Sequence, residues 1–146
     1  ARAIYDPDLF QAYDLPAEPM IAAQKLTGSA KPPATRLQIT ELREKPLLIH
    51  RSNEAMISEV CRKNGFQPFI LCRGDDVRSL LAWADAGLGV AIVLKSATGL
   101  VPSNHLTFQE IADPTLSIKK AIIWNRNRYL SNVARNFLAC LLAART

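Results

Sequence analysis

Short apolar runs and amphipathic stretches alternate along the middle of the chain. The runs are PLLI at 46–49, FILC at 69–72 and VAIV at 90–93, and runs that are apolar throughout are typical of strands buried on both faces. Between them, apolar residues recur every three or four positions, the spacing of a helix's buried face. These residues are Ala55, Ile57, Val60 and Cys61, then Val77, Leu80, Leu81 and Ala84. Two strand–helix–strand units in succession predict an α/β fold with a mostly parallel sheet flanked by helices.

Capping residues and glycines mark the ends of the two predicted helices. The expected starts are Ser52 for the first helix and Asp75 or Asp76 for the second, and the expected ends are Asn64-Gly65 and Gly87. Gly89 then permits close approach of the backbone as the chain turns into the strand at 90–93.

The flanks of this central region carry weaker patterns. We expect one helical turn at 8–11, a strand at 19–23, a loop at 28–33, a short helix at 40–44 and a strand at 116–124. A long helix is predicted over 130–144. Its inward-facing residues are expected to be Val133, Phe137, Leu138 and Leu141.

Composition narrows the function. No apolar run approaches the roughly 18 residues of a membrane span, and no signal peptide is apparent. Three separated cysteines and two histidines supply no zinc spacing, and no cofactor motif is present, so we expect no metal or cofactor. The net charge of +5 is dispersed, which argues against a nucleic-acid-binding face.

Polar residues follow the predicted strands, where parallel α/β sheets place their ligands. Two of these loops lead into helix N-termini, which suit an anion. The candidate ligand-binding residues are His50, Arg51, Ser52, Asn53, Arg73, Gly74, Asp75, Asp76 and, at the end of the last strand, Trp124. The alternative interpretation is that Ser52 and Asp75 cap helices and that the arginines face water. A catalytic triad of His50, Ser52 and Asp75 lacks the G-x-S-x-G elbow, so we predict no enzyme.

The segment LLAWADAGLGVAIVLKSA resembles the effector-binding domain of LysR-type transcriptional regulators. Four further stretches resemble the same domain in order along the chain. They are PAEPMIAA, LQITELREKPLLIHRS, GFQPFILCRGDDVRSLL and SIKKAIIWNRNRYLSNVARNFLACL. Leu94 departs from the pattern, because the family usually has proline there.

The resemblance implies a periplasmic-binding-protein-like α/β domain with two subdomains. Residues 26–116 would form a nearly complete second subdomain, and residues 1–25 with 117–146 a partial first one. The family's N-terminal winged helix-turn-helix and the opening strands of the first subdomain have no counterpart here. The chain is therefore expected to be a fragment.

The implied function is sensing of a small metabolite in the cytoplasm, with DNA bound only through the missing N-terminal domain and no membrane partner. The segment WADAGLG, which contains Trp83, resembles the corresponding segment of family members that respond to small organic acids. Homo-oligomers, dimers or tetramers, are expected to pair through 52–64 and 69–72. The alternatives are a fragment of a periplasmic-type solute-binding protein and a small α/β hydrolase.

Overall fold

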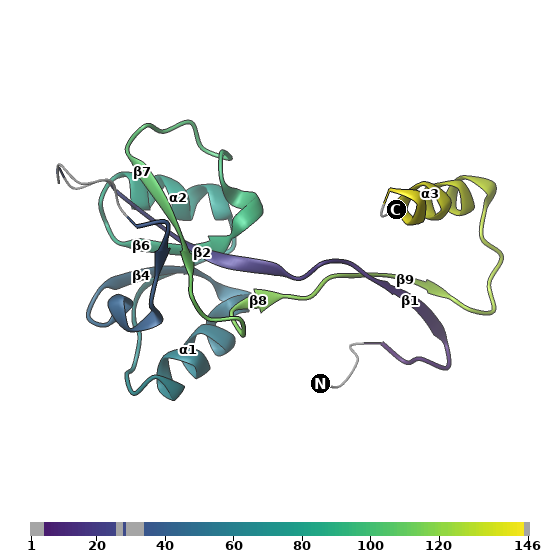
Figure 1. Ribbon diagram of the computed structural model, residues 1–146, viewed down its shortest axis with the longest axis horizontal. Coiled ribbons are helices and arrows are strands. Elements are labelled where there is room, and N and C mark those ends of the chain that lie inside the picture. The colour runs from purple at the N-terminus through teal and green to yellow at the C-terminus, as the bar shows by residue number, and fades with distance from the viewer. Residues whose placement is uncertain (1–4, 26–27, 29–33, 145–146) are drawn as a thin grey trace. The chain divides into compact units, whose positions relative to one another are not determined.

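The computed structural model describes residues 5–25, 28 and 34–144 (Figure 1). The chain divides into two compact units. Unit 1 comprises Ala1–Leu15 and Ala121–Thr146, and unit 2 comprises Pro16–Lys120. Apart from Gly28, the loop predicted at 28–33 lies outside the described residues. The predicted split into effector subdomains, 1–25 with 117–146 and 26–116, stays a prediction.

Unit 2 is built on a mixed sheet with strand order β3-β7-β2-β6-β4-β5, and β8 pairs with β2 outside this path. The strands are β2 (Glu18–Lys25), β3 (Arg36–Leu37), β4 (Pro46–His50), β5 (Phe69–Gly74), β6 (Val90–Leu94), β7 (Leu106–Ile111) and β8 (Ser117–Ile118). As predicted, β4 is parallel to both β5 and β6. The sheet is mixed because β2 runs antiparallel to β6 and β7.

Helices cover both faces of this sheet, because successive side chains of a buried strand point to opposite faces. Leu47 and Ile49 of β4 pack with Ile57 of helix α1 (Glu54–Lys63) in one hydrophobic cluster. Leu48, between them, packs with Leu81 of α2 (Val77–Asp85) in the other cluster. The predicted α/β fold class, a sheet flanked by helices, is confirmed.

The glycines at the helix ends act as predicted. Gly65 and Gly87 have left-handed backbones with φ of 77° and 83°. At Gly89 a Cβ atom would lie 2.4 Å from the main-chain oxygen of Pro46. Only glycine therefore lets β6 enter the sheet so close to the start of β4.

Asp76, one of the two residues predicted to cap the second helix, caps α2. Other local predictions were wrong. Ser52 does not cap the first helix. The chain after β4 first forms the 3-10 helix η2 (Arg51–Asn53), whose N-cap is His50, and α1 begins after it. The predicted helix at 40–44 is the 3-10 helix η1 (Ile39–Leu42), where Gln38 and Glu41 form a capping box.

The predicted strand at 116–124 is interrupted at 119–120. Its halves, β8 and β9 (Ala121–Asn125), belong to different units. Residues 10–14 form strand β1 rather than continuing the helical turn predicted at 8–11. Strand β7 was not predicted.

Unit 1 consists of an antiparallel pair, β1 (Phe10–Asp14) with β9, and the helix α3 (Asn132–Ala143). None of its described residues is buried. Val133 and Phe137, which were predicted to face inward, are 79% and 58% exposed. The prediction was wrong for these two residues because the described part of unit 1 has no layer that covers this face of α3.

Candidate functional site

The predicted loops gather at one edge of the sheet in unit 2. Because β4 is parallel to both of its neighbours, the carboxyl ends of β5, β4 and β6 lie next to one another. The segments that follow are Asp75-Asp76 before α2, η2 after β4, and the 3-10 helix η3 (Lys95–Ala97) after β6. The residues predicted at 50–53 and 73–76 are thus brought together.

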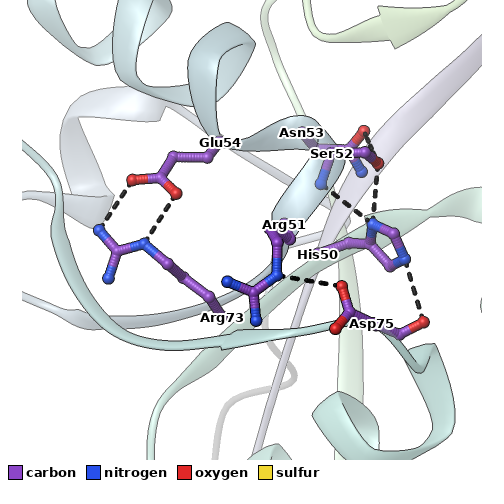
Figure 2. A network of polar contacts seen from close by, with 7 residues as sticks. All are labelled: His50, Arg51, Ser52, Asn53, Glu54, Arg73 and Asp75. Atoms are coloured by element: carbon purple, nitrogen blue, oxygen red, sulfur yellow. Dashed lines mark hydrogen bonds and ion pairs between the residues drawn. The ribbon is translucent and has the colours of Figure 1, made fainter.

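His50 lies at the centre of a hydrogen-bond network (Figure 2). Its Nδ1 is 2.8 Å from Ser52 Oγ and accepts a bond of 3.3 Å from the Ser52 backbone N–H. Its Nε2 is 3.2 Å from the main-chain oxygen of Asp75. Since a carbonyl oxygen only accepts, these contacts fit the tautomer with its hydrogen on Nε2. The network ties the end of β4 to the loop after β5.

The two candidate arginines are paired with carboxylates of the same loops (Figure 2). Arg51 Nε lies 3.2 Å from Asp75 Oδ1. Arg73 binds both oxygens of Glu54 at 2.7 Å, a bidentate contact. The hydrogen bonds of Arg73 lower the pKa of Glu54, and those of Glu54 raise the pKa of Arg73. An incoming carboxylate has to compete with a side chain that is already in place.

His50, Ser52 and Asp75, the triad of the hydrolase alternative, are not arranged as a catalytic triad. His50 and Ser52 are within hydrogen-bonding distance, but Asp75 offers the imidazole its main-chain oxygen. The Asp75 carboxylate pairs with Arg51 instead. Among the described residues, no side-chain carboxylate therefore orients the histidine as a catalytic triad requires.

Two candidates have structural roles at this edge. Asp76 accepts hydrogen bonds from the backbone N–H groups of Arg78 and Ser79 and from the Ser79 hydroxyl, and these bonds lower its pKa. At Gly74, a Cβ atom would lie 3.0 Å from the Leu80 side chain. A ligand contact by either residue stays a prediction.

A cavity of about 440 Å³ opens beside the network. Its lining residues are His50, Ser52, Asn53, Val77, Val93, Leu94, Ser96, Ala97, Leu100 and Ile118. Three of the predicted residues are among them, while Arg51, Arg73, Gly74, Asp75 and Asp76 lie outside the lining. None of the described lining residues is Lys, Arg, Asp or Glu. It combines a broad apolar wall with a few hydroxyl, amide and imidazole groups, the usual composition of a small-molecule site.

A second, larger hollow of about 560 Å³ lies between Asp85 and the loop from Gly99 to His105. Asp85 ends α2, which runs from the carboxyl end of β5 back toward the start of β6, so this hollow is at the opposite edge of the sheet. Two of its lining residues are paired, because the Ser103 hydroxyl donates a hydrogen bond of 2.5 Å to Asp85 Oδ1. The carboxyl ends of the parallel strands β4, β5 and β6 lie at the other edge, so the smaller cavity is the better candidate.

Trp124 lies in unit 1, on β9, where its Nε1 donates a hydrogen bond of 2.8 Å to Gln11 on the paired strand. The other candidates all belong to unit 2. A ligand contact by Trp124 stays a prediction.

Glu18 is a residue of this region that the sequence did not reveal. Its Oε1 accepts a hydrogen bond of 2.6 Å from the backbone N–H of Ser96, and its Oε2 pairs with Lys120. The bonds to Lys120 and then Ser96 lower the pKa of Glu18 to about 2. No periodicity or motif connects residues so far apart along the chain.

Other kinds of site were sought in the part of the chain that the structure describes. No group of three or more His, Cys, Asp or Glu side chains there has a geometry that suits a metal ion. Within the same residues, no helix has the length and apolar character needed to cross a bilayer.

Residues 6–146 match the LysR substrate binding domain. The chain belongs to this family. The family consists of domains of transcriptional regulators and is not a class of enzymes. A curated relative, the uncharacterised HTH-type transcriptional regulator YwbI of Bacillus subtilis (strain 168), is 26% identical over 104 residues. The match covers 69% of this chain and 35% of that relative, so the chain spans about a third of the relative's length.

Two solved LysR structures show the same fold. The regulatory domain of CcmR from Synechocystis PCC6803, in complex with 2-PG, superposes with a TM-score of 0.76 at 10% identity, covering 96% of this chain and 69% of that one. HinK from Pseudomonas aeruginosa gives a TM-score of 0.74 at 15% identity, covering 95% of this chain and 49% of that one. The predicted resemblance and the periplasmic-binding-protein-like fold class are confirmed for this LysR domain.

Proposed function

We propose that this LysR domain binds a small metabolite in the cavity beside His50 and thereby controls DNA binding by an N-terminal winged helix-turn-helix of its parent regulator. The cavity is the observation that carries the proposal. It lies where the carboxyl ends of parallel strands meet, and its volume of about 440 Å³ suits a small organic molecule. The helix-turn-helix of the Bacillus relative and the ligand in the Synechocystis structure support the same role.

The lining suggests how a ligand would be held. Val77, Val93 and Leu100 offer apolar surface to its carbon skeleton. Ser52 and Asn53 offer a hydroxyl and an amide to its polar end. We propose an organic acid as the ligand class, since its carboxylate oxygens can accept a hydrogen bond from the Asn53 amide and a second from the Ser52 hydroxyl when that group turns away from His50. The ion-paired Arg51 and Arg73 lie at the same edge of the sheet and would add charge only by exchanging partners.

The alternative of a periplasmic-type solute receptor is not favoured, because the curated relative and the structural neighbours are transcriptional regulators. We propose a cytoplasmic protein that works without a cofactor or a membrane partner.

Association of copies is part of the proposal. Strand β5 lies at one end of the strand order in the described sheet, so its outer edge is unpaired. Phe69 and Leu71 on it are 54% and 47% exposed. An open strand edge with apolar side chains is suited to pairing with another chain. We propose that α1 and β5 form the contact of a homo-oligomer.

A ligand screen tests the proposed function. We expect at least one small organic acid to raise the melting temperature of the chain in a thermal-shift screen. Isothermal titration should then show that Asn53→Ala weakens binding about two- to tenfold, because one hydrogen bond is lost. Glu59→Gln is the control, since Glu59 pairs with Arg62 and Lys63 away from the cavity. A ligand that binds wild type and Asn53→Ala equally would argue against this cavity.

A further inference from the structure

Glu18 joins two segments that are distant in the sequence. One carboxylate oxygen accepts the N–H of Ser96 at 2.6 Å, and the other pairs with the ammonium group of Lys120. The Glu18 side chain is only 15% exposed, whereas that of Lys120 is 42% exposed. A hydrogen-bonded carboxylate with so little solvent contact holds its partners more firmly than an exposed surface pair does.

Both partners of this ion pair lie where the chain passes between the two units. The chain crosses from unit 1 to unit 2 after Leu15 and returns to unit 1 after Lys120. Glu18 begins β2 just after the first crossing, and β2 pairs with β8 just before the second. The bond from Glu18 to Lys120 therefore fastens the two crossing segments to each other on the unit 2 side.

The third contact reaches the ligand cavity. Ser96 belongs to η3, and Ser96 and Ala97 both line the cavity. Ile118 of β8, which faces Glu18 in the strand register, lines it as well. The cavity wall and the crossing segments thus share one carboxylate.

We propose that Glu18 is a positioning residue that couples the cavity wall at Ser96 to the two chain crossings at Lys120. Movement of η3 displaces one carboxylate oxygen, and the other oxygen transmits this displacement to Lys120. The proposal rests on the proposed function of the cavity for its biological role. Its physical content, a linkage between Ser96 and Lys120, can be measured without a ligand.

The linkage requires two acceptor oxygens on one rigid group. In Glu18→Gln the amide oxygen can still accept from Ser96, but the amide nitrogen offers Lys120 only a donor. Lys120→Gln removes the charge without touching Ser96. Lys120→Arg keeps a cation at the crossing and should preserve the linkage.

Amide hydrogen exchange by NMR provides the first readout. Lys120→Gln should accelerate exchange of the Ser96 N–H at least about twofold, and Glu18→Ala, which removes its acceptor, at least about tenfold. Lys120→Arg should stay close to wild type. Glu59→Gln, which breaks an ion pair on α1, is the control and should leave Ser96 unchanged. A wild-type Ser96 rate in Lys120→Gln would overturn the proposal, because Lys120 would then not act on the cavity wall.

The second readout is a distance between one site in each unit, which depends on the two crossing segments that connect the units. One spin label goes on the native, exposed Cys140 of unit 1, and another on Ala82→Cys, an exposed position of α2 in unit 2, with Cys72→Ser in the background. Cys61 is buried and its thiol pKa is raised to about 11, so it remains unlabelled. The distance distribution from pulsed electron resonance should broaden in Lys120→Gln and Glu18→Gln but not in Glu59→Gln.

An unchanged distance distribution in both variants would overturn the coupling, even if Ser96 exchange is faster. Circular dichroism melting of each variant separates these effects from unfolding, and Lys120→Arg provides the rescue. Because no ligand is added, failure here is distinct from failure of the ligand screen, which would count against the proposed function alone.

Discussion

The two units of the molecule place similar amphipathic helices in opposite surroundings. In unit 2, Leu80, Leu81 and Ala84 of α2 are completely buried against the sheet. In unit 1, none of the described residues of α3 is buried, and Phe137 is 58% exposed. The pattern of apolar residues identifies which face of a helix needs cover. It does not say whether the chain itself provides the cover.

This contrast assigns the stability of the chain to unit 2. Burial of apolar side chains is the dominant favourable term in folding, and the described residues with fully buried side chains all belong to unit 2. The β1–β9 pair and α3 should add little to the free energy of unfolding.

The largest expected effect is a core truncation compared between the units. Leu48→Ala removes a side chain that is 1% exposed, and it should lower the free energy of unfolding by about 2–5 kcal/mol. Leu142→Ala is the same change at a residue that is 53% exposed in α3, and it should cost less than about 0.5 kcal/mol. Urea denaturation of both variants measures the difference. Equal losses would show that α3 is covered in solution.

The next effect tests how tightly the sheet of unit 2 is packed. Gly89→Ala places a Cβ atom 2.4 Å from the Pro46 main-chain oxygen, and the backbone shift it forces should cost about 1–3 kcal/mol. Gly28→Ala is the control, because a Cβ atom there meets nothing within 4 Å. Thermal unfolding of the two variants should differ by several degrees. A Gly89→Ala variant as stable as Gly28→Ala would contradict the observed contact between β4 and β6.

The two junction glycines illustrate what the sequence predicts well. The helix-ending and close-approach roles of Gly87 and Gly89 were both predicted, because a helix followed at once by an apolar strand leaves the chain few conformations. The same holds for β4, β5 and β6. Each is a continuous apolar run whose burial follows from its own composition.

Features set by distant pairing were not predicted. Strand β7 lies between β2 and β3, and its paired polar residues Thr107, Gln109 and Glu110 hide it from a search for apolar runs. At the candidate site, the approach of the loops at 50–53 and 73–76 to each other was predicted. The pairings of Arg51 with Asp75 and of Arg73 with Glu54 depend on side-chain directions that spacing does not determine.

The next test measures how the Glu18–Lys120 ion pair, beside the boundary between the units, contributes to the free energy of unfolding as the pH changes. The pKa of Glu18 falls from 4.5 to about 2 on folding, so its contribution is complete above pH 4.5 and is lost as the pH falls toward 2. Glu18→Gln should cost about 1–2 kcal/mol at pH 7. The difference from wild type should hold down to about pH 5 and shrink by pH 3 in urea denaturation. A difference that stays constant to pH 3 would contradict the assigned ion pair.

The smallest expected effect compares helix caps in the two units. Asp76→Ala removes the cap of α2, which is packed against the sheet, and should lower the midpoint of global unfolding. Ser131→Ala removes a single bond of 3.2 Å to the Ala134 N–H at the start of α3. It should reduce the helical circular dichroism signal and leave the midpoint unchanged. A shift of the midpoint in Ser131→Ala would show that α3 unfolds cooperatively with unit 2, which would contradict this prediction.

The most direct test of the ligand cavity is a two-dimensional ¹⁵N NMR titration of the chain with an organic acid that raises its melting temperature. We predict that the largest shift changes fall on His50, Ser52, Asn53, Ser96 and Ala97, which line the cavity at the strand carboxyl ends. Amides of Asp85 and from Ser103 to His105, which line the other hollow, should not move. Changes confined to that opposite hollow would contradict the assignment of the ligand site.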